Sequence, residues 1–127
     1  GRVGGYYSGY TFANQLGVTT QVPYMVEIVS NNASARVREV NLHGRRVLLR
    51  KARVLVTKEN YRILQFLDFL KDIDQYADEN DKILSDRIRK YVVDVQIKKT
   101  EIDCYIKQYP DRIYRYIYEM RLYDVFA

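Results

Sequence analysis

The pattern of hydrophobic and polar positions changes near the middle of the chain. Between Tyr24 and Val56, β-branched and aromatic residues occur in short runs separated by turn residues, which is typical of strands. From Thr57 onward, apolar residues recur every three or four positions, which is typical of amphipathic helices. Because the two patterns occupy separate parts of the chain, the sequence predicts an α+β fold with segregated elements.

A short helix is predicted before the strands. It covers Ser8–Leu16, with Ser8 as its cap and Gly17 as the left-handed residue that ends it. Val22–Pro23 then returns the backbone to extended geometry. A strand follows over Tyr24–Val29, and the turn residues 30–32 end it.

A hairpin forms the centre of the predicted sheet. Arg36–Leu42 pairs with Arg45–Arg50 around a two-residue His43–Gly44 turn, which places Val40 opposite Val47. Val54–Val56 continues as a further extended piece. The sequence therefore predicts a small antiparallel sheet of three or four strands with an arginine-rich exposed face.

Three or four helices are predicted in the second half. The first is capped by Thr57 and runs through Gln75, the second restarts at Asn80–Asp81, the third opens at Thr100, and the fourth has Pro110 as its first residue. The residues expected to face inward are Tyr61, Ile63, Leu64, Phe66, Leu67, Leu70, Ile73, Leu84, Ile88, Tyr91, Val92, Val95, Ile102, Tyr105, Ile106, Ile113, Tyr116, Ile117 and Met120.

The composition is that of an ordinary globular domain. The chain has 127 residues, of which 47% are hydrophobic and 29% charged, and we interpret residues 1–127 as a single domain. No apolar run is long enough to span a membrane. A single cysteine, Cys104, excludes an internal disulfide and favours a reducing, cytoplasmic location; we expect it to be a small buried residue.

The net charge of +5 is unevenly distributed. Residues 30–56 hold seven cations and one acid, whereas residues 68–86 hold seven acids and two lysines. Arginine binds phosphate bidentately, so the cations are candidates for contact with nucleic acid or an acidic partner; they also suit a role in keeping a sheet edge soluble. These seven candidates are Arg36, Arg38, Arg45, Arg46, Arg50, Lys51 and Arg53.

Tyrosine is abundant, with thirteen residues and no tryptophan, and it concentrates in the last quarter of the chain. Some of these side chains must belong to the core. Exposed tyrosine is typical of protein interfaces, and base stacking is the alternative. Tyr114, Tyr118 and Tyr123 are the predicted protein-interface residues, compatible with oligomerisation through these helices.

Signals for catalysis are weak. The only histidine, His43, lies at a predicted turn, and Asp72 and Asp74 point in different directions on a predicted helix. No phosphate-binding glycine loop occurs. We therefore expect no enzymatic activity, no cofactor and no metal; the alternative is a magnesium-dependent nuclease or nucleotidyltransferase remnant that uses Glu27, Glu39 or the Asp72/Asp74 pair.

Several stretches together suggest a family. Tyr7–Pro23, which contains Ser8–Gly9 and Leu16–Gly17, resembles the corresponding segment of AbiEi-like antitoxins, the transcriptional regulators of bacterial type IV toxin–antitoxin systems linked to abortive phage infection. The similarity extends over Val26–Val29, the basic hairpin, Asn60–Asp68 and Tyr109–Tyr114.

This resemblance implies a non-enzymatic role. Family members carry an amino-terminal winged-helix domain that binds operator DNA and a carboxy-terminal domain that neutralises a nucleotidyltransferase-like toxin. The chain resembles the carboxy-terminal domain, and no winged helix is recognisable in it. The resemblance thus implies a functional partnership with such a toxin and a secondary contact with duplex DNA, without a membrane partner.

Overall fold

The computed structural model describes residues 4–21, 24–34, 36–76 and 81–127, and it confirms the α+β class. The expectations for Val22–Pro23 and for Asn80 lie outside the described residues. The elements are, in order, β1 (Gly5–Tyr7), α1 (Gly9–Leu16), β2 (Val26–Ser30), β3 (Val37–Leu42), β4 (Arg45–Lys51), α2 (Tyr61–Lys71), α3 (Ile73–Tyr76), α4 (Asp81–Val95), α5 (Lys99–Tyr105), η1 (Ile106–Gln108), α6 (Arg112–Glu119) and η2 (Leu122–Asp124).

The sheet is mixed, not purely antiparallel as expected. Its strand order is β1-β2-β4-β3, and β2 runs parallel to β4, with Val26 opposite Val47. The reason is that β4 lies between β2 and β3, so the chain passes from β2 to the outer edge before it returns. The unpredicted strand β1 pairs with β2 in antiparallel orientation and closes the other edge.

The predicted hairpin is confirmed. Val40 lies opposite Val47, and His43 and Gly44 have φ angles of 51° and 78°, the two positive values that a type I′ turn requires. The further extended piece, Val54–Val56, is not a strand. The backbone N–H and C=O of Val56 instead bind the side chain of Asn31, each at 2.8 Å.

Helix α1 ends as predicted but begins differently. Gly17 has a left-handed φ of 77° and closes the helix. Ser8 makes no side-chain capping bond. The carboxylate of Glu27, on β2, accepts a hydrogen bond from the Tyr10 N–H at 2.7 Å instead. Gly9 has a φ of +55°, and a side chain there would collide with the same carboxylate, so the start of α1 is fixed by the sheet.

The first predicted long helix is shorter at both ends. Thr57 is not its cap; Asn60 precedes the first helical residue and exchanges hydrogen bonds with the Thr57 backbone and hydroxyl at 2.8 and 3.2 Å. The helix ends at Lys71, because Asp72 leaves helical geometry and its carboxylate pairs with Arg112. The remaining turn forms α3 as a separate piece.

Two later helices begin close to the expected residues. Helix α5 starts at Lys99, after an extended Lys98, so Thr100 lies inside the helix and does not open it. Helix α6 starts at Arg112, and the Pro110 carbonyl accepts a bond from Ile113 at 3.1 Å, so Pro110 precedes the helix. No helix in the described part of the chain is long and apolar enough to cross a membrane.

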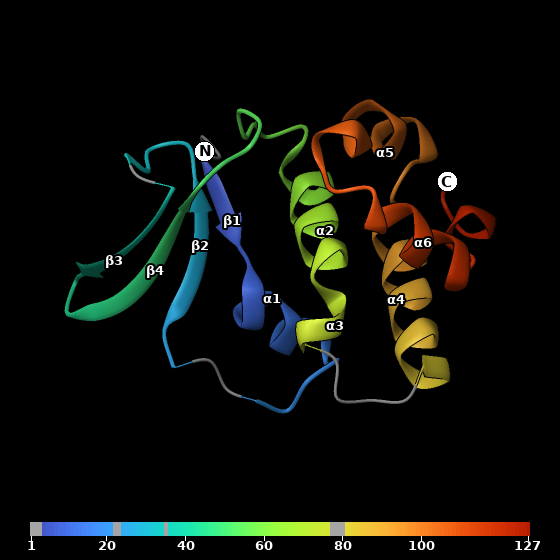
Figure 1. Cartoon of the computed structure of the whole chain (residues 1–127), viewed down its shortest axis with the longest axis horizontal. Coiled ribbons are helices and arrows are strands. Elements are labelled where there is room, and N and C mark those ends of the chain that lie inside the picture. The colour runs from blue at the N-terminus through green and yellow to red at the C-terminus, as the bar shows by residue number, and fades with distance from the viewer. Residues whose placement is uncertain (1–3, 22–23, 35, 77–80) are drawn as a thin grey trace.

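Helix α2 forms the centre of the core. It lies between the sheet and α4–α6 (Figure 1), and Phe66, Leu67 and Leu70 on it have no exposed surface. The buried stripes predicted for α4 and α6 are confirmed at Ile88 and Ile117. The prediction for Cys104 is wrong, because its side chain is exposed while its α5 neighbour Ile102 is turned inward.

Candidate nucleic-acid interface and adjoining pocket

The seven predicted cations lie together on the β3–β4 hairpin and its flanks. We call this set, Arg36, Arg38, Arg45, Arg46, Arg50, Lys51 and Arg53, the cationic ribbon. Figure 1 shows the two strands extending away from the helices, at the edge of the molecule. Six of the seven residues are exposed, and Arg50 is half-buried.

The cations are distributed over both faces of the ribbon. Opposed residues in a sheet share a face, and successive residues alternate between faces. Since Arg38 lies opposite Leu49, it shares a face with Arg45 and Lys51. Arg46 and Arg50 lie on the other face. This face carries Tyr6 of β1 and Val29 of β2, which are both buried in the core with α2. Arginines therefore stand on both faces, but Arg46 and Arg50 share their face with Glu39 and Glu27, whereas Arg38, Arg45 and Lys51 stand together on the opposite face.

Few of these cations are neutralised by acids. Arg46 pairs with Glu39 and also donates to the Tyr24 hydroxyl at 3.0 Å; the hydrogen bond that it donates to Glu39 raises the pKa of Arg46, which stays charged. Arg50 approaches Glu27 at 3.8 Å. Among the residues that the structure describes, the other five cations of the ribbon have no ion-pair partner.

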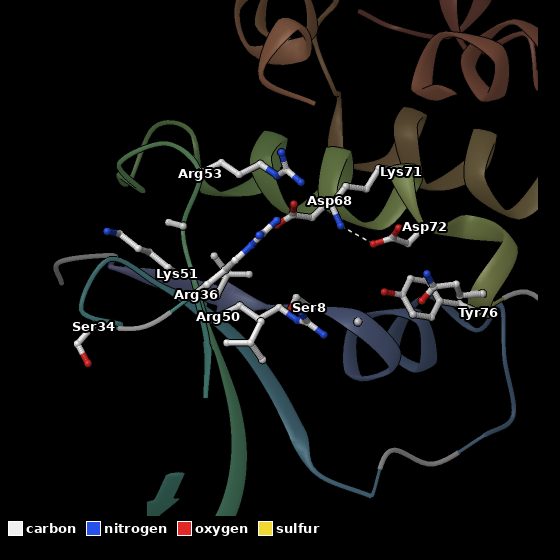
Figure 2. Close-up of a pocket in the computed structure, with 15 residues that line it drawn as sticks. Ser8, Ser34, Arg36, Arg50, Lys51, Arg53, Asp68, Lys71, Asp72 and Tyr76 are labelled. Carbon is white, nitrogen blue, oxygen red and sulfur yellow. Dashed lines mark hydrogen bonds and ion pairs between the residues drawn. The ribbon is translucent and has the colours of Figure 1, made fainter. Parts of the chain in front are cut away.

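A pocket of about 610 Å³ adjoins the ribbon, between the sheet and α2. Figure 2 shows Asp68, Lys71 and Asp72 on the α2 side, facing Arg36 and Arg50 on the sheet side. The side chains of Lys51 and Ser34 point away from the pocket in the same view. The full lining is Ser8, Gly9, Val29, Ser34, Arg36, Val37, Arg50, Lys51, Ala52, Arg53, Asp68, Lys71, Asp72, Gln75 and Tyr76.

A buried tyrosine–aspartate cluster lies beneath one wall of the pocket. The Tyr6 hydroxyl donates to Asp68, and burial, together with the charge of Asp68, raises the pKa of Tyr6 and of Tyr109. Burial also raises the pKa of Asp68, although Tyr6, Lys71 and Arg53 act in the opposite direction. Asp68 therefore takes up a proton more readily than an exposed carboxylate.

The other acids weighed as catalytic groups each have separate partners. Asp72 binds Lys71 and Arg112, whereas Asp74 accepts a hydrogen bond from Tyr116 at 2.8 Å. Glu27 caps α1 and Glu39 pairs with Arg46. In the described ranges, no group of three or more potential ligands gathers for a metal ion, so this geometry gives the magnesium alternative no support.

The three predicted interface tyrosines are exposed. Tyr118 on α6 is 83% exposed, and Tyr114 and Tyr123 are each 42% exposed. Tyr123 also packs edge-to-face on Phe126, with ring centroids 5.5 Å apart. Their exposure is as expected, whereas their role in an interface stays a prediction.

Sequence analysis missed the residues of the pocket that lie outside the hairpin. The sequence gives Asp68 and Lys71 only as charges of the segment 68–86, and Ser8 only as a helix cap. A local pattern does not indicate that β4 and α2 face each other across a cavity. The signal that was present is Asp68, a carboxylate within the otherwise apolar stripe of α2.

Comparison of the chain with models of protein families, with curated proteins and with solved structures gives no match in any of the three.

Proposed function

We propose that this domain is a non-enzymatic regulatory module that binds duplex DNA through the cationic ribbon, in a cytoplasmic antitoxin of the AbiEi-like type. The observation that carries the DNA contact is the ribbon itself. Five of its seven cations have no acidic partner among the described residues. Three of these, Arg38, Arg45 and Lys51, lie on the two strands that project from the molecule, and Arg36 and Arg53 flank them.

The tip of the hairpin, residues 41–46, extends past β2 as a two-stranded ribbon, because β2 pairs with β4 only over Val47–Lys51, and this shape suits a groove of DNA. The major groove of B-DNA admits a two-stranded β-ribbon, and several DNA-binding folds insert one there. Arg38, Arg45 and Lys51 share one face of the two strands and have no ion-pair partner among the described residues, so they are the cations available to a phosphate backbone. Arg46, on the other face, pairs with Glu39.

The test is a titration of labelled duplex DNA at salt concentrations from about 50 mM to about 200 mM. Each phosphate contact contributes about 0.9 to the slope of log affinity against log salt. We expect Arg38→Gln and Arg45→Gln each to weaken binding and to reduce that slope by about 0.9. Binding that is absent at the lowest salt contradicts the proposal.

A matched control separates the ribbon from net charge. Arg115 is an exposed arginine on α6, on the helical side of the molecule, with a side chain that is 60% exposed. Arg115→Gln removes the same charge from a different surface. We expect its salt slope to equal that of the unchanged chain; an equal loss in both variants contradicts a ribbon-specific contact.

The antitoxin part of the proposal has its own test. Its support is the resemblance of Tyr7–Pro23 and of the basic hairpin to AbiEi-like antitoxins. Co-expression of the full-length gene with an adjacent nucleotidyltransferase-like reading frame should relieve growth arrest. Unchanged toxicity contradicts the antitoxin role but leaves the DNA contact standing, because the two are measured separately.

A further inference from the structure

The pocket between the sheet and α2 has the size of a ligand site. Its volume of about 610 Å³ lies within the range of about 300–1,000 Å³ that is usual for small-molecule pockets. Residues far apart in the sequence form it, since Arg36 and Arg50 come from the hairpin region and Lys71 from α2. A cavity of this size is larger than a single phosphate ion requires.

The walls of the pocket carry an excess of cations. Arg36 and Arg50 stand on one side and Lys71 on the other, while Arg53 lies at the rim, stacked over Tyr109 with its guanidinium carbon 5.3 Å from the ring centroid. Cations on opposite walls attract an anion that bridges them, and they repel one another when no anion is present.

The lining holds two acids, Asp68 and Asp72, against the four cations named above. The Asp72 carboxylate lies between Lys71 and Arg112, with the Arg112 contact at 3.0 Å. Asp68 is bound by the Tyr6 hydroxyl. Its pKa is raised by burial, so its negative charge is more easily lost than that of an exposed carboxylate.

The lining also contains an unsatisfied polar group. The hydroxyl of Ser8 is buried and has no hydrogen-bond partner, and it is the only such side-chain atom in the described part of the chain. Ser8 is 5% exposed and lines the pocket on its sheet side (Figure 2). Buried hydroxyls without a protein partner are uncommon in folded proteins, and an ordered water or a bound group is the usual partner.

We propose that this pocket binds a chain of two or three linked phosphate groups, either free or as part of a nucleotide. Arg36 and Arg50 hold one end of the chain and Lys71 the other, and arginine forks bind phosphate oxygens bidentately. The proposal goes beyond the DNA contact, because Lys71 lies outside the ribbon and Arg45 of the ribbon lies outside the pocket.

The experiment measures binding of inorganic tripolyphosphate to the full chain by calorimetry, with orthophosphate, a nucleoside triphosphate and a short DNA duplex as further ligands. Arg50→Gln and Lys71→Met should each weaken tripolyphosphate binding about ten- to a hundredfold, the effect of removing a charged hydrogen bond. Arg36→Gln, in an exposed bend, provides a third variant that does not depend on the interior of the fold.

Arg45→Gln is the matched control, since it removes one ribbon arginine outside the pocket. We expect it to weaken DNA binding while leaving the affinity for tripolyphosphate within about twofold. We expect Lys71→Met to weaken tripolyphosphate binding while leaving the affinity for DNA within about twofold. A nucleoside triphosphate that binds more tightly than tripolyphosphate identifies a nucleotide as the source; equal affinities identify the phosphate chain alone.

Three results would overturn the proposal. These are no binding of tripolyphosphate at low salt, equal affinity for orthophosphate, or an equal loss of affinity in Arg45→Gln and Arg50→Gln. None of them bears on the DNA contact, which is read from the duplex titration. Unfolding curves of each variant show whether a lost affinity reflects a lost fold.

Discussion

Strand β3 and helix α2 differ most in how they use their side chains. Five of the six residues of β3 are exposed and none is buried, whereas six of the eleven residues of α2 are buried. Strand β3 is the outer edge of the sheet, while α2 contacts the sheet on one side and other helices on the other. The comparison indicates that α2 lies at the centre of the buried core, whereas the side chains of β3 contribute little to it.

The largest expected effect tests this division directly. Phe66 on α2 is fully buried and stacks on Tyr91 with ring centroids 5.8 Å apart, so Phe66→Ala leaves a cavity. We expect a loss of about 3–5 kcal/mol in the free energy of unfolding, measured by urea denaturation. Leu42→Ala on β3, at a residue that is 46% exposed, should cost about 0.5 kcal/mol. Similar losses in the two variants would contradict the division.

The same contrast explains what the sequence could predict. The faces of α2, α4 and α6 follow a local period of 3.6 residues, so Leu64, Ile88 and Ile117 were correctly placed in the core. The hairpin turn at His43–Gly44 is equally local. Strand β1 has only three residues, one of them glycine, and exists because β2 is available to pair with it.

Nonlocal geometry accounts for the rest. The β-branched and aromatic run predicts that β2 is a strand. It does not predict that the neighbour of β2 is β4 instead of β3. Glu27 caps α1 in place of Ser8. Gly9 has no side chain, so the carboxylate of Glu27 on β2 can approach the start of the helix. The pocket depends on the same kind of pairing, so the sequence predicts its other cations together, as part of the basic hairpin, but does not join Lys71 to them.

A second variant tests the junction between the two regions. Gly9 and Gly44 both have positive φ angles, of 55° and 78°, but only at Gly9 would a side chain meet Glu27. Gly9→Ala should cost about 1–3 kcal/mol, since it combines backbone strain with the loss of the carboxylate cap. A side chain at Gly44 meets open space, so Gly44→Ala should cost only the backbone strain of the positive φ angle. If urea denaturation gives equal losses of unfolding free energy for Gly9→Ala and Gly44→Ala, the Glu27 contact contributes nothing to stability.

A smaller effect concerns Asp68, which joins the helical core to the pocket. Its pKa in the folded chain is raised by burial above the ordinary value of about 3.9. Between these two pKa values the folded chain holds a proton that the unfolded chain has released. The resulting stability is complete below the unfolded pKa and is lost as the pH rises through the folded pKa.

Asp68→Asn removes this proton while keeping an acceptor for the Tyr6 hydroxyl. We expect its free energy of unfolding to fall less than that of the unchanged chain as the pH rises from the ordinary carboxyl range toward neutrality. Urea denaturation across that pH range is the measurement. Asp94→Asn, at an exposed carboxylate on α4, should leave the pH dependence unchanged; a matching change in both would assign the effect to surface charge.

The smallest expected effect lies on the outer surface of the helices. Tyr118 is 83% exposed, so Tyr118→Ser should change the free energy of unfolding by less than about 0.5 kcal/mol. It lies on α6, away from the hairpin (Figure 1), so it should also leave duplex DNA affinity within about twofold. Tyr116→Ser on the same helix removes a buried ring and should destabilise the fold without a direct effect on DNA. If Tyr118→Ser instead weakens DNA binding as much as Arg38→Gln does, the binding surface extends over the helices, and stability and binding do not belong to separate regions.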